Sequence, residues 1–193
     1  MLPELRPRHA GDAELTCIVG IVDKGVVHMG GDSAGVSGYS VTVRRDPKVF
    51  QVGDYLIGYT SSFRMGQLLR FNLSVGEQDP RHDDFQHMAT VFIDAVRNAL
   101  KSGGYARIDS GAETGGDFLV GYKGRLYKIE ADFQVGESMD DFDCVGCGED
   151  YALGSLYATR SLTASKRITL ALEAAAHFSA GVRAPFVVKE LAA

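Results

Sequence analysis

Residues 16–32 read TCIVGIVDKGVVHMGGD, and this stretch decides how the fold begins. Two β-rich runs, at residues 17–22 and 26–29, flank a Lys-Gly pair at residues 24–25. A short glycine-containing turn between two β-branched runs is typical of a β-hairpin. The stretch therefore predicts two antiparallel strands, the first of which starts immediately after Thr16.

Residues 1–15, MLPELRPRHAGDAEL, differ from everything that follows. They contain two of the five prolines and show neither the strand nor the helix period. Their charged residues also interrupt the apolar run that a secretory signal needs. We therefore expect a leader or propeptide at residues 1–15 and a single domain at residues 16–193.

The composition is that of one globular domain. The 193 residues are 45% hydrophobic and 23% charged, with a net charge of −5, so no basic excess points to a nucleic-acid partner. No apolar run approaches the roughly 20 residues that a membrane span needs. Three cysteines, an odd count, do not suggest a disulfide framework, so we expect a cytoplasmic protein. The 23 glycines indicate many tight turns between strands.

The remaining pattern groups strands and helices in blocks. Strands are expected at residues 39–45, 48–52, 55–59, 117–122, 125–130, 133–136, 142–146 and 186–191, and helices at residues 61–73, 83–103, 150–159 and 164–180. Strands do not alternate singly with helices, which argues against a parallel α/β fold. The pattern predicts the α+β class, as a four-layer αββα sandwich in which a helix pair covers each of two antiparallel sheets.

Thr16 is the first candidate for chemistry. A threonine hydroxyl is a poor nucleophile until a base takes its proton. Removal of the leader would create that base on the same residue, because an α-amine has a pKa of about 7.7–8. The alternative is an ordinary threonine at the start of a strand.

Two charged residues follow Thr16 at equal intervals. Asp32 ends the second predicted strand 16 residues later, and Lys48 begins another strand 16 residues after that. A lysine beside Thr16 would lower the pKa of its amine and stabilise an alkoxide, and Asp32 would hold that lysine in place. The alternative is a surface ion pair with little energetic value.

These residues carry a family resemblance. Thr16-Cys-Ile-Val-Gly-Ile-Val, Gly31-Asp32-Ser33 and Lys48-Val49-Phe50 resemble proteasome β subunits and bacterial HslV, which are N-terminal-nucleophile (Ntn) hydrolases. The family places its nucleophilic Thr, its Asp and its Lys at the same two intervals. A later stretch, Val145-Gly-Cys-Gly-Glu-Asp-Tyr-Ala, resembles the family's Gly-Ser-Gly segment before a helix. The resemblance runs from about residue 16 to residue 191 and implies the αββα fold.

The resemblance also implies roles for individual residues. Thr16 resembles the nucleophile, with Asp32 and Lys48 as its supporting pair. Ser62 occupies the position whose backbone N–H forms the oxyanion hole, where the family usually has Gly, and Thr60 would line the pocket. The remaining two positions are Cys147, where the family has a supporting serine, and His177, which lies near the place of a family Asp that is missing here.

Some alternatives stay open. Leu15 precedes the nucleophile where self-processing members have Gly, so either autolysis or another protease could expose Thr16. Cys17 is the competing nucleophile. The CxxC at residues 144–147 is a possible redox motif or an ordinary strand end, and neither the cysteines nor the five histidines have metal-ligand spacing.

The sequence thus predicts a threonine-type peptidase or amidase that needs no metal or cofactor. The resemblance implies autoprocessing, a homo-oligomer (a ring among the possibilities), and an ATPase unfoldase as a partner. The alternatives are a catalytically inactive Ntn-fold scaffold or binding protein and an Ntn amidase for small amides. Peptides and small amides are the expected substrates, and neither nucleic acid nor a membrane is an expected partner.

Overall fold

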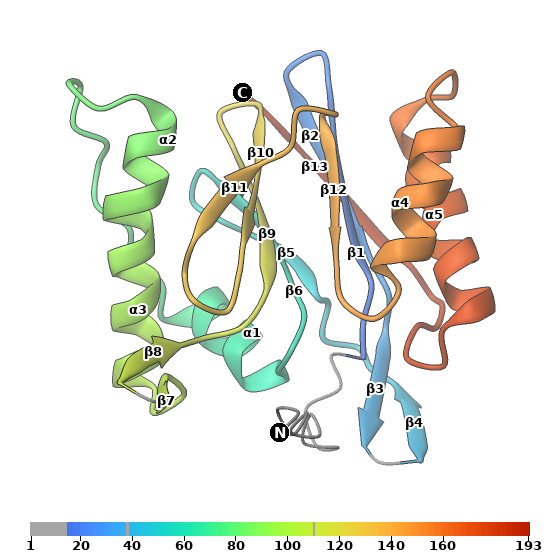
Figure 1. Ribbon diagram of the computed structural model, residues 1–193, viewed down its shortest axis with the longest axis horizontal. Coiled ribbons are helices and arrows are strands. Elements are labelled where there is room, and N and C mark those ends of the chain that lie inside the picture. The colour runs from blue at the N-terminus through green and yellow to red at the C-terminus, as the bar shows by residue number, and fades with distance from the viewer. Residues whose placement is uncertain (1–14, 38, 110) are drawn as a thin grey trace, which may run out of the picture.

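The computed structural model describes residues 15–37, 39–109 and 111–193. Apart from Leu15, the expected leader lies outside the described residues. The described chain forms two larger antiparallel sheets (Figure 1). The four-stranded sheet has the order β12 (Phe142–Val145), β1 (Ile18–Asp23), β2 (Val26–Gly31) and β13 (Val187–Ala192). The five-stranded sheet has the order β11 (Val135–Glu137), β10 (Arg125–Ile129), β9 (Phe118–Tyr122), β6 (Tyr55–Tyr59) and β5 (Val49–Val52).

Helices lie on the outer side of each sheet (Figure 1). The helices beside the five-stranded sheet are α1 (Phe63–Phe71), α2 (Asp84–His87), η1 (Met88–Phe92) and α3 (Ile93–Ser102). The helices beside the four-stranded sheet are α4 (Glu149–Ala158) and α5 (Ala164–Phe178). The predicted helix at residues 83–103 is present, and its middle turn, η1, is a π-helix. The α+β class and the two antiparallel sheets are therefore confirmed.

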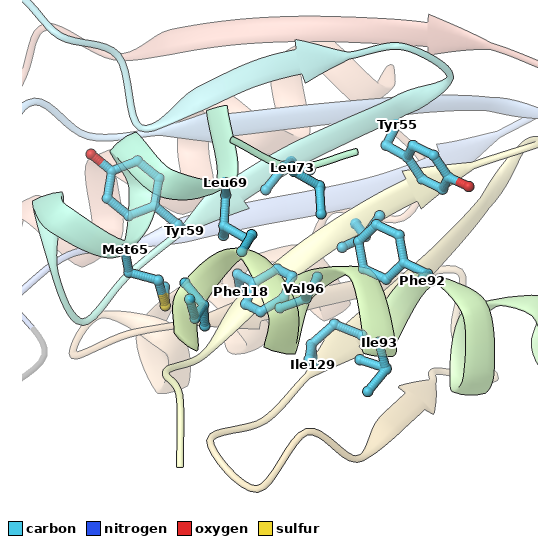
Figure 2. Close-up of a cluster of buried hydrophobic side chains, with 14 of the residues drawn as sticks. Tyr55, Tyr59, Met65, Leu69, Leu73, Phe92, Ile93, Val96, Phe118 and Ile129 are labelled. Carbon is cyan, nitrogen blue, oxygen red and sulfur yellow. The ribbon is translucent and has the colours of Figure 1, made fainter. Parts of the chain in front are cut away.

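Three buried clusters hold these elements together. One joins the five-stranded sheet to α1, η1 and α3, and Figure 2 shows Leu69, Phe92, Val96 and Phe118 within it. A second joins the four-stranded sheet to α4 and α5. The third is drawn from strands of both sheets, among them Ile18, Met29, Leu56 and Leu119. Apolar side chains on both faces of each sheet explain why several strands read as continuous hydrophobic runs.

The glycines have two structural roles, whereas their number alone predicted only tight turns between strands. Gly25, Gly53 and Gly124 have positive φ angles and make the predicted hairpin turns. Gly58 instead faces the other sheet, where an added Cβ would lie 2.5 Å from Ile18 Cγ2. Part of the glycine excess therefore allows the two sheets to approach closely.

Two small hairpins extend the described fold, and of their four strands only the one at residues 39–45 was predicted. β3 (Ala34–Ser37) pairs with β4 (Ser40–Val43), and β7 (Arg107–Asp109) pairs with β8 (Ala112–Thr114). Both pairs project from the body of the molecule (Figure 1) and lack the long apolar runs that mark a core strand. No helix in the described part of the chain has both the length and the apolar character to cross a membrane.

Candidate active site

Strand ends bring the three predicted catalytic residues together. Thr16 precedes β1 and Asp32 follows β2, and the antiparallel pairing of Ile18 with Gly31 places these two ends side by side. Lys48 precedes β5 in the other sheet. A Cβ added to Gly31 would lie 2.8 Å from Ile18 Cδ1 and 3.0 Å from Val49 Cγ2, so a glycine here lets the start of β5 approach the end of β2.

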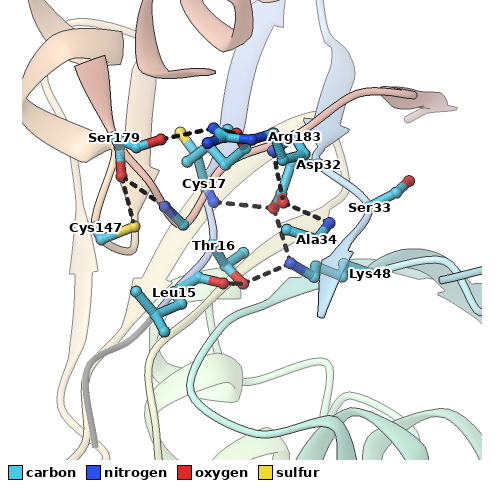
Figure 3. Close-up of polar contacts among 12 residues, drawn as sticks. Leu15, Thr16, Cys17, Asp32, Ser33, Ala34, Lys48, Cys147, Ser179 and Arg183 are labelled. Atoms are coloured by element: carbon cyan, nitrogen blue, oxygen red, sulfur yellow. Dashed lines mark hydrogen bonds and ion pairs between the residues drawn. The ribbon is translucent and has the colours of Figure 1, made fainter. Parts of the chain in front are cut away.

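The side chains of Thr16, Lys48 and Asp32 are linked by hydrogen bonds, with Lys48 in the middle (Figure 3). Lys48 Nζ donates to Thr16 Oγ1 at 2.7 Å and to Asp32 Oδ1 at 2.9 Å. The three residues are at most 5% exposed. A buried charge is tolerated when it is paired and hydrogen-bonded, so the surface ion pair considered as an alternative does not describe this arrangement.

Backbone amides hold the Asp32 carboxylate. Its Oδ1 also accepts from Cys17 N at 3.1 Å, and its Oδ2 accepts from Ala34 N at 2.8 Å and from Arg183 N at 3.4 Å. These three main-chain donors fix the position of the Asp32 carboxylate beside Lys48.

Burial of Lys48 and the charge of Asp32 have opposite effects on the pKa of Lys48. Burial lowers the pKa of its ammonium group, and the Asp32 carboxylate counteracts this by favouring the charged form. The ammonium lies against a hydroxyl oxygen in a buried site. Such a group can stabilise negative charge that develops on Thr16 Oγ1.

Thr16 is still joined to Leu15 in the described chain. Its nitrogen is an amide, and its Oγ1 donates to the Leu15 carbonyl at 2.6 Å. The carbonyl of Thr16 lies against Gly146, where an added Cβ would come within 2.3 Å of that oxygen. Gly146 also has a φ of 102°, which disfavours any side chain. Gly146 belongs to the Gly-Cys-Gly stretch that carries part of the family resemblance, but its contact with the Thr16 carbonyl was not predicted.

A pocket opens beside Thr16, with an empty volume of about 360 Å³. Its lining consists of Leu15, Thr16, Val36, Lys48, Tyr59, Thr60, Ser61, Ser62 and Phe63. Thr60 therefore lines the pocket as expected, and its own Oγ1 donates to the Asp117 carbonyl at 3.0 Å.

Ser62 lies in the same pocket and begins α1. Its Oγ accepts from Arg64 N at 3.1 Å, which makes it the N-cap of the helix. Its backbone N–H donates to the Thr60 carbonyl at 2.6 Å. The amide is thus placed at the pocket wall, although it already has an acceptor there.

The last two predicted residues have different surroundings. Cys147 Sγ lies 3.0 Å from Ser179 Oγ, on the opposite side of Thr16 from Lys48 (Figure 3). His177 is exposed on α5, and its ring packs edge-on against Phe178. Among the contacts of the described residues, His177 has no hydrogen bond or ion pair with Thr16, Asp32 or Lys48.

Cys17 is a poor alternative nucleophile. Its side chain is fully buried in the cluster between the four-stranded sheet and α4 and α5. Burial and the nearby Asp32 carboxylate raise the pKa of its thiol, which disfavours the reactive thiolate. In the described ranges, no group of three His, Cys, Asp or Glu side chains is placed to hold a metal ion.

Comparison with known proteins places this geometry in a known fold. No family model and no curated protein matches the sequence. A structure of Thiobacillus denitrificans BPH in complex with epoxomicin is 23% identical, covers 92% of this chain and 98% of that chain, and has a TM-score of 0.76. HslV from Trypanosoma brucei is 16% identical over 92% of this chain and all of that chain, with a TM-score of 0.64.

The chain has the fold of HslV. Anbu from Yersinia bercovieri shares it too, at 15% identity over 92% of this chain and 82% of that chain, with a TM-score of 0.62. The resemblance predicted from about residue 16 to residue 191 is therefore confirmed at the level of the fold, and identities this low show the fold alone.

Proposed function

We propose that the chain is a threonine-type Ntn hydrolase that cleaves amide bonds with Thr16 as its nucleophile. The observation that carries the proposal is the buried chain from Asp32 through Lys48 to Thr16 Oγ1. An Asp-held lysine on a hydroxyl oxygen supplies what a threonine needs in order to react, except for a base. The HslV fold supports the same reading.

Removal of residues 1–15 supplies the base. The freed α-amine of Thr16 takes the proton from Oγ1 as that oxygen attacks the substrate carbonyl carbon. The C–N bond of the amide then breaks, the leaving nitrogen receives the proton, and an acyl ester remains on Oγ1. Water, deprotonated by the same amine, attacks the ester and releases the acid and the free hydroxyl.

Two further groups support the reaction in this proposal. The Ser62 N–H donates to the oxyanion of the tetrahedral intermediate, for which it must leave or share the Thr60 carbonyl that it contacts at 2.6 Å. Lys48 stabilises charge on Oγ1 in the same step. The pocket that contains Thr60 and Ser62 receives the substrate side chain next to the scissile bond.

The wider expectations rest on the resemblance. We propose that the layers form the αββα sandwich of Ntn hydrolases within one domain, residues 16–193. We also propose removal of residues 1–15 by autolysis or another protease, a cytoplasmic location, assembly into a homo-oligomer and cooperation with an ATPase unfoldase. Supporting roles for Cys147 and His177 are part of the same proposal.

Covalent labelling tests the proposed function. An epoxyketone such as epoxomicin, the compound present in one BPH structure, requires both a free N-terminal amine and an adjacent hydroxyl. We expect one adduct on Thr16 and none in the Thr16→Ala variant, while Thr90→Ala, which removes an exposed helix hydroxyl, keeps the label. Absence of the adduct from the wild-type protein would support the inactive scaffold instead. Hydrolysis of small amides but not of peptides would favour the small-amide amidase.

A further inference from the structure

The segment after α5 returns to the catalytic carboxylate. The backbone N–H of Arg183 donates to Asp32 Oδ2 at 3.4 Å, although 151 residues separate the two. Ser33 N donates to the Arg183 carbonyl at 3.0 Å, and Ser33 Oγ donates to the Pro185 carbonyl at 2.6 Å. Two backbone N–H groups and the Ser33 hydroxyl thus hold residues 183–185 against the end of β2, beside Asp32.

The Arg183 side chain closes the turn that leads there. Its Nη1 donates to the carbonyls of Val182 at 2.6 Å, Ser179 at 3.1 Å and Ala176 at 3.4 Å. The last carbonyls of a helix have no partner within the helix, and a basic side chain commonly satisfies them. The guanidinium therefore fixes the turn of residues 179–183 against the end of α5.

The same turn also touches the other side of Thr16. Ser179 Oγ accepts from Gly181 N at 3.4 Å and lies 3.0 Å from Cys147 Sγ. A Cβ added to Gly181 would come within 2.8 Å of both Cys147 Sγ and Leu15 Cδ2. The turn thus extends from the residue before the nucleophile to Asp32 (Figure 3).

We infer that Arg183 is a positioning residue, whose guanidinium shapes the turn of residues 179–183 so that its own N–H orients Asp32 toward Lys48. This inference rests on the proposed function in that the oriented group is the proposed Lys48 partner. Arg183 does not touch the reacting atoms, so its effect reaches Thr16 through Asp32 and Lys48.

The exposure of Arg183 allows its positioning role to be tested apart from any role in the stability of the fold. The residue is exposed, so water can satisfy the three carbonyls when the guanidinium is removed. The fold should therefore survive the substitution. A bond of 3.4 Å is already near the limit of useful length, so a small shift of the turn is enough to lose it.

Hydrogen exchange tests the inference without requiring enzymatic activity. The Arg183→Ala variant keeps the backbone N–H at position 183, so its protection can be measured by NMR in both chains. We expect the protection factor of this amide to fall about tenfold, because the turn of residues 179–183 should open more often without the guanidinium. Amides of the core strand β10 and the melting temperature should stay close to wild type. Arg183→Lys should restore part of the protection, and Arg160→Ala, which removes another exposed arginine, should leave it unchanged.

Epoxyketone labelling of the same variants gives the second readout. We expect the maximal inactivation rate to fall about tenfold in Arg183→Ala, with an unchanged inhibitor constant, because a charge-assisted hydrogen bond is lost away from the inhibitor. Wild-type protection at position 183, a general loss of protection across β10, or a wild-type inactivation rate would overturn the inference. If the wild-type chain takes no label at all, the proposed function fails, and the exchange data alone decide whether Arg183 holds the turn.

Discussion

The Lys48 ammonium lies 2.7 Å from the Thr16 hydroxyl oxygen, although the two residues belong to different sheets. Thr16 directly precedes β1 of the four-stranded sheet, and Lys48 directly precedes β5, an edge strand of the five-stranded sheet. The candidate site therefore exists only where the two sheets are packed. The stability of this packing and the chemistry proposed for Thr16 therefore depend on the same contact.

The buried pair of Asp32 and Lys48 gives the first prediction. Asp32→Asn or Lys48→Met alone should cost about 3–5 kcal/mol of unfolding free energy, because each leaves one buried partner uncompensated. The double variant should lose less than the sum of the two single losses. Urea unfolding of the four proteins measures this coupling, and strictly additive losses would contradict it. All three variants should lose epoxyketone labelling.

Cys17 gives a prediction about the identity of the nucleophile. Burial disfavours ionisation of the Cys17 thiol, so the Cys17→Ala variant should be labelled by the epoxyketone at a rate within about twofold of that of the wild type. Thr16→Ala should take no label. Labelling that depends on Cys17 rather than Thr16, located by peptide mass spectrometry, would refute the assignment of the nucleophile.

Gly146 gives a prediction about backbone geometry. Gly146→Ala adds a Cβ at a φ of 102° and within 2.3 Å of the Thr16 carbonyl oxygen, so we expect a loss of at least about 2 kcal/mol and of labelling. Gly154→Ala is the matched control, since its Cβ meets nothing within 4 Å on α4. That control should be more stable by about 0.5–1 kcal/mol. Equal effects of the two substitutions in thermal unfolding would count against this reading.

His87 gives a prediction about pH. Its fully buried ring lies 2.7 Å by Nε2 from Tyr55 Oη, and burial lowers its pKa below the ordinary value of 6.5. The unfolded chain therefore binds a proton at a higher pH than the folded chain, so stability is lost as pH falls below about 6.5. Urea unfolding at about pH 7.5 and pH 5.5 should show a smaller loss for His87→Gln than for wild type. An exposed-histidine control, His177→Gln, should keep the wild-type dependence.

Strand patterns predicted the larger part of the fold. Hairpins with a Lys-Gly or Gly-Asp turn, such as those at residues 24–25 and 53–54, were located because turn chemistry and β-branched runs agree there. The π-helical turn at residues 88–92 was not, since its apolar spacing continues that of the helices around it. Three of the four strands in the small hairpins escaped prediction, because strands of three or four residues carry little hydrophobic signal, whereas the alternating run at residues 39–45 was found.

The candidate site, like the fold, was predicted only in part. The candidates Thr16, Asp32 and Lys48 were found because each lies at the end of a predicted strand and because their spacing resembles that of the Ntn hydrolases. The amide of Arg183 and the close approach of Gly146 could not be predicted from one sequence. The former is a main-chain contact that no residue type encodes, and the latter depends on the path of residues far away in the chain.

The mature N-terminus is the most direct test of Thr16 as the nucleophile. The purified, epoxyketone-reactive protein should be analysed by intact mass spectrometry and N-terminal sequencing. We expect a chain of residues 16–193 that begins with Thr16 and carries the label there. An active protein that retains Met1 and the whole of residues 1–15 would contradict it, because Thr16 would then have no free amine to act as its base.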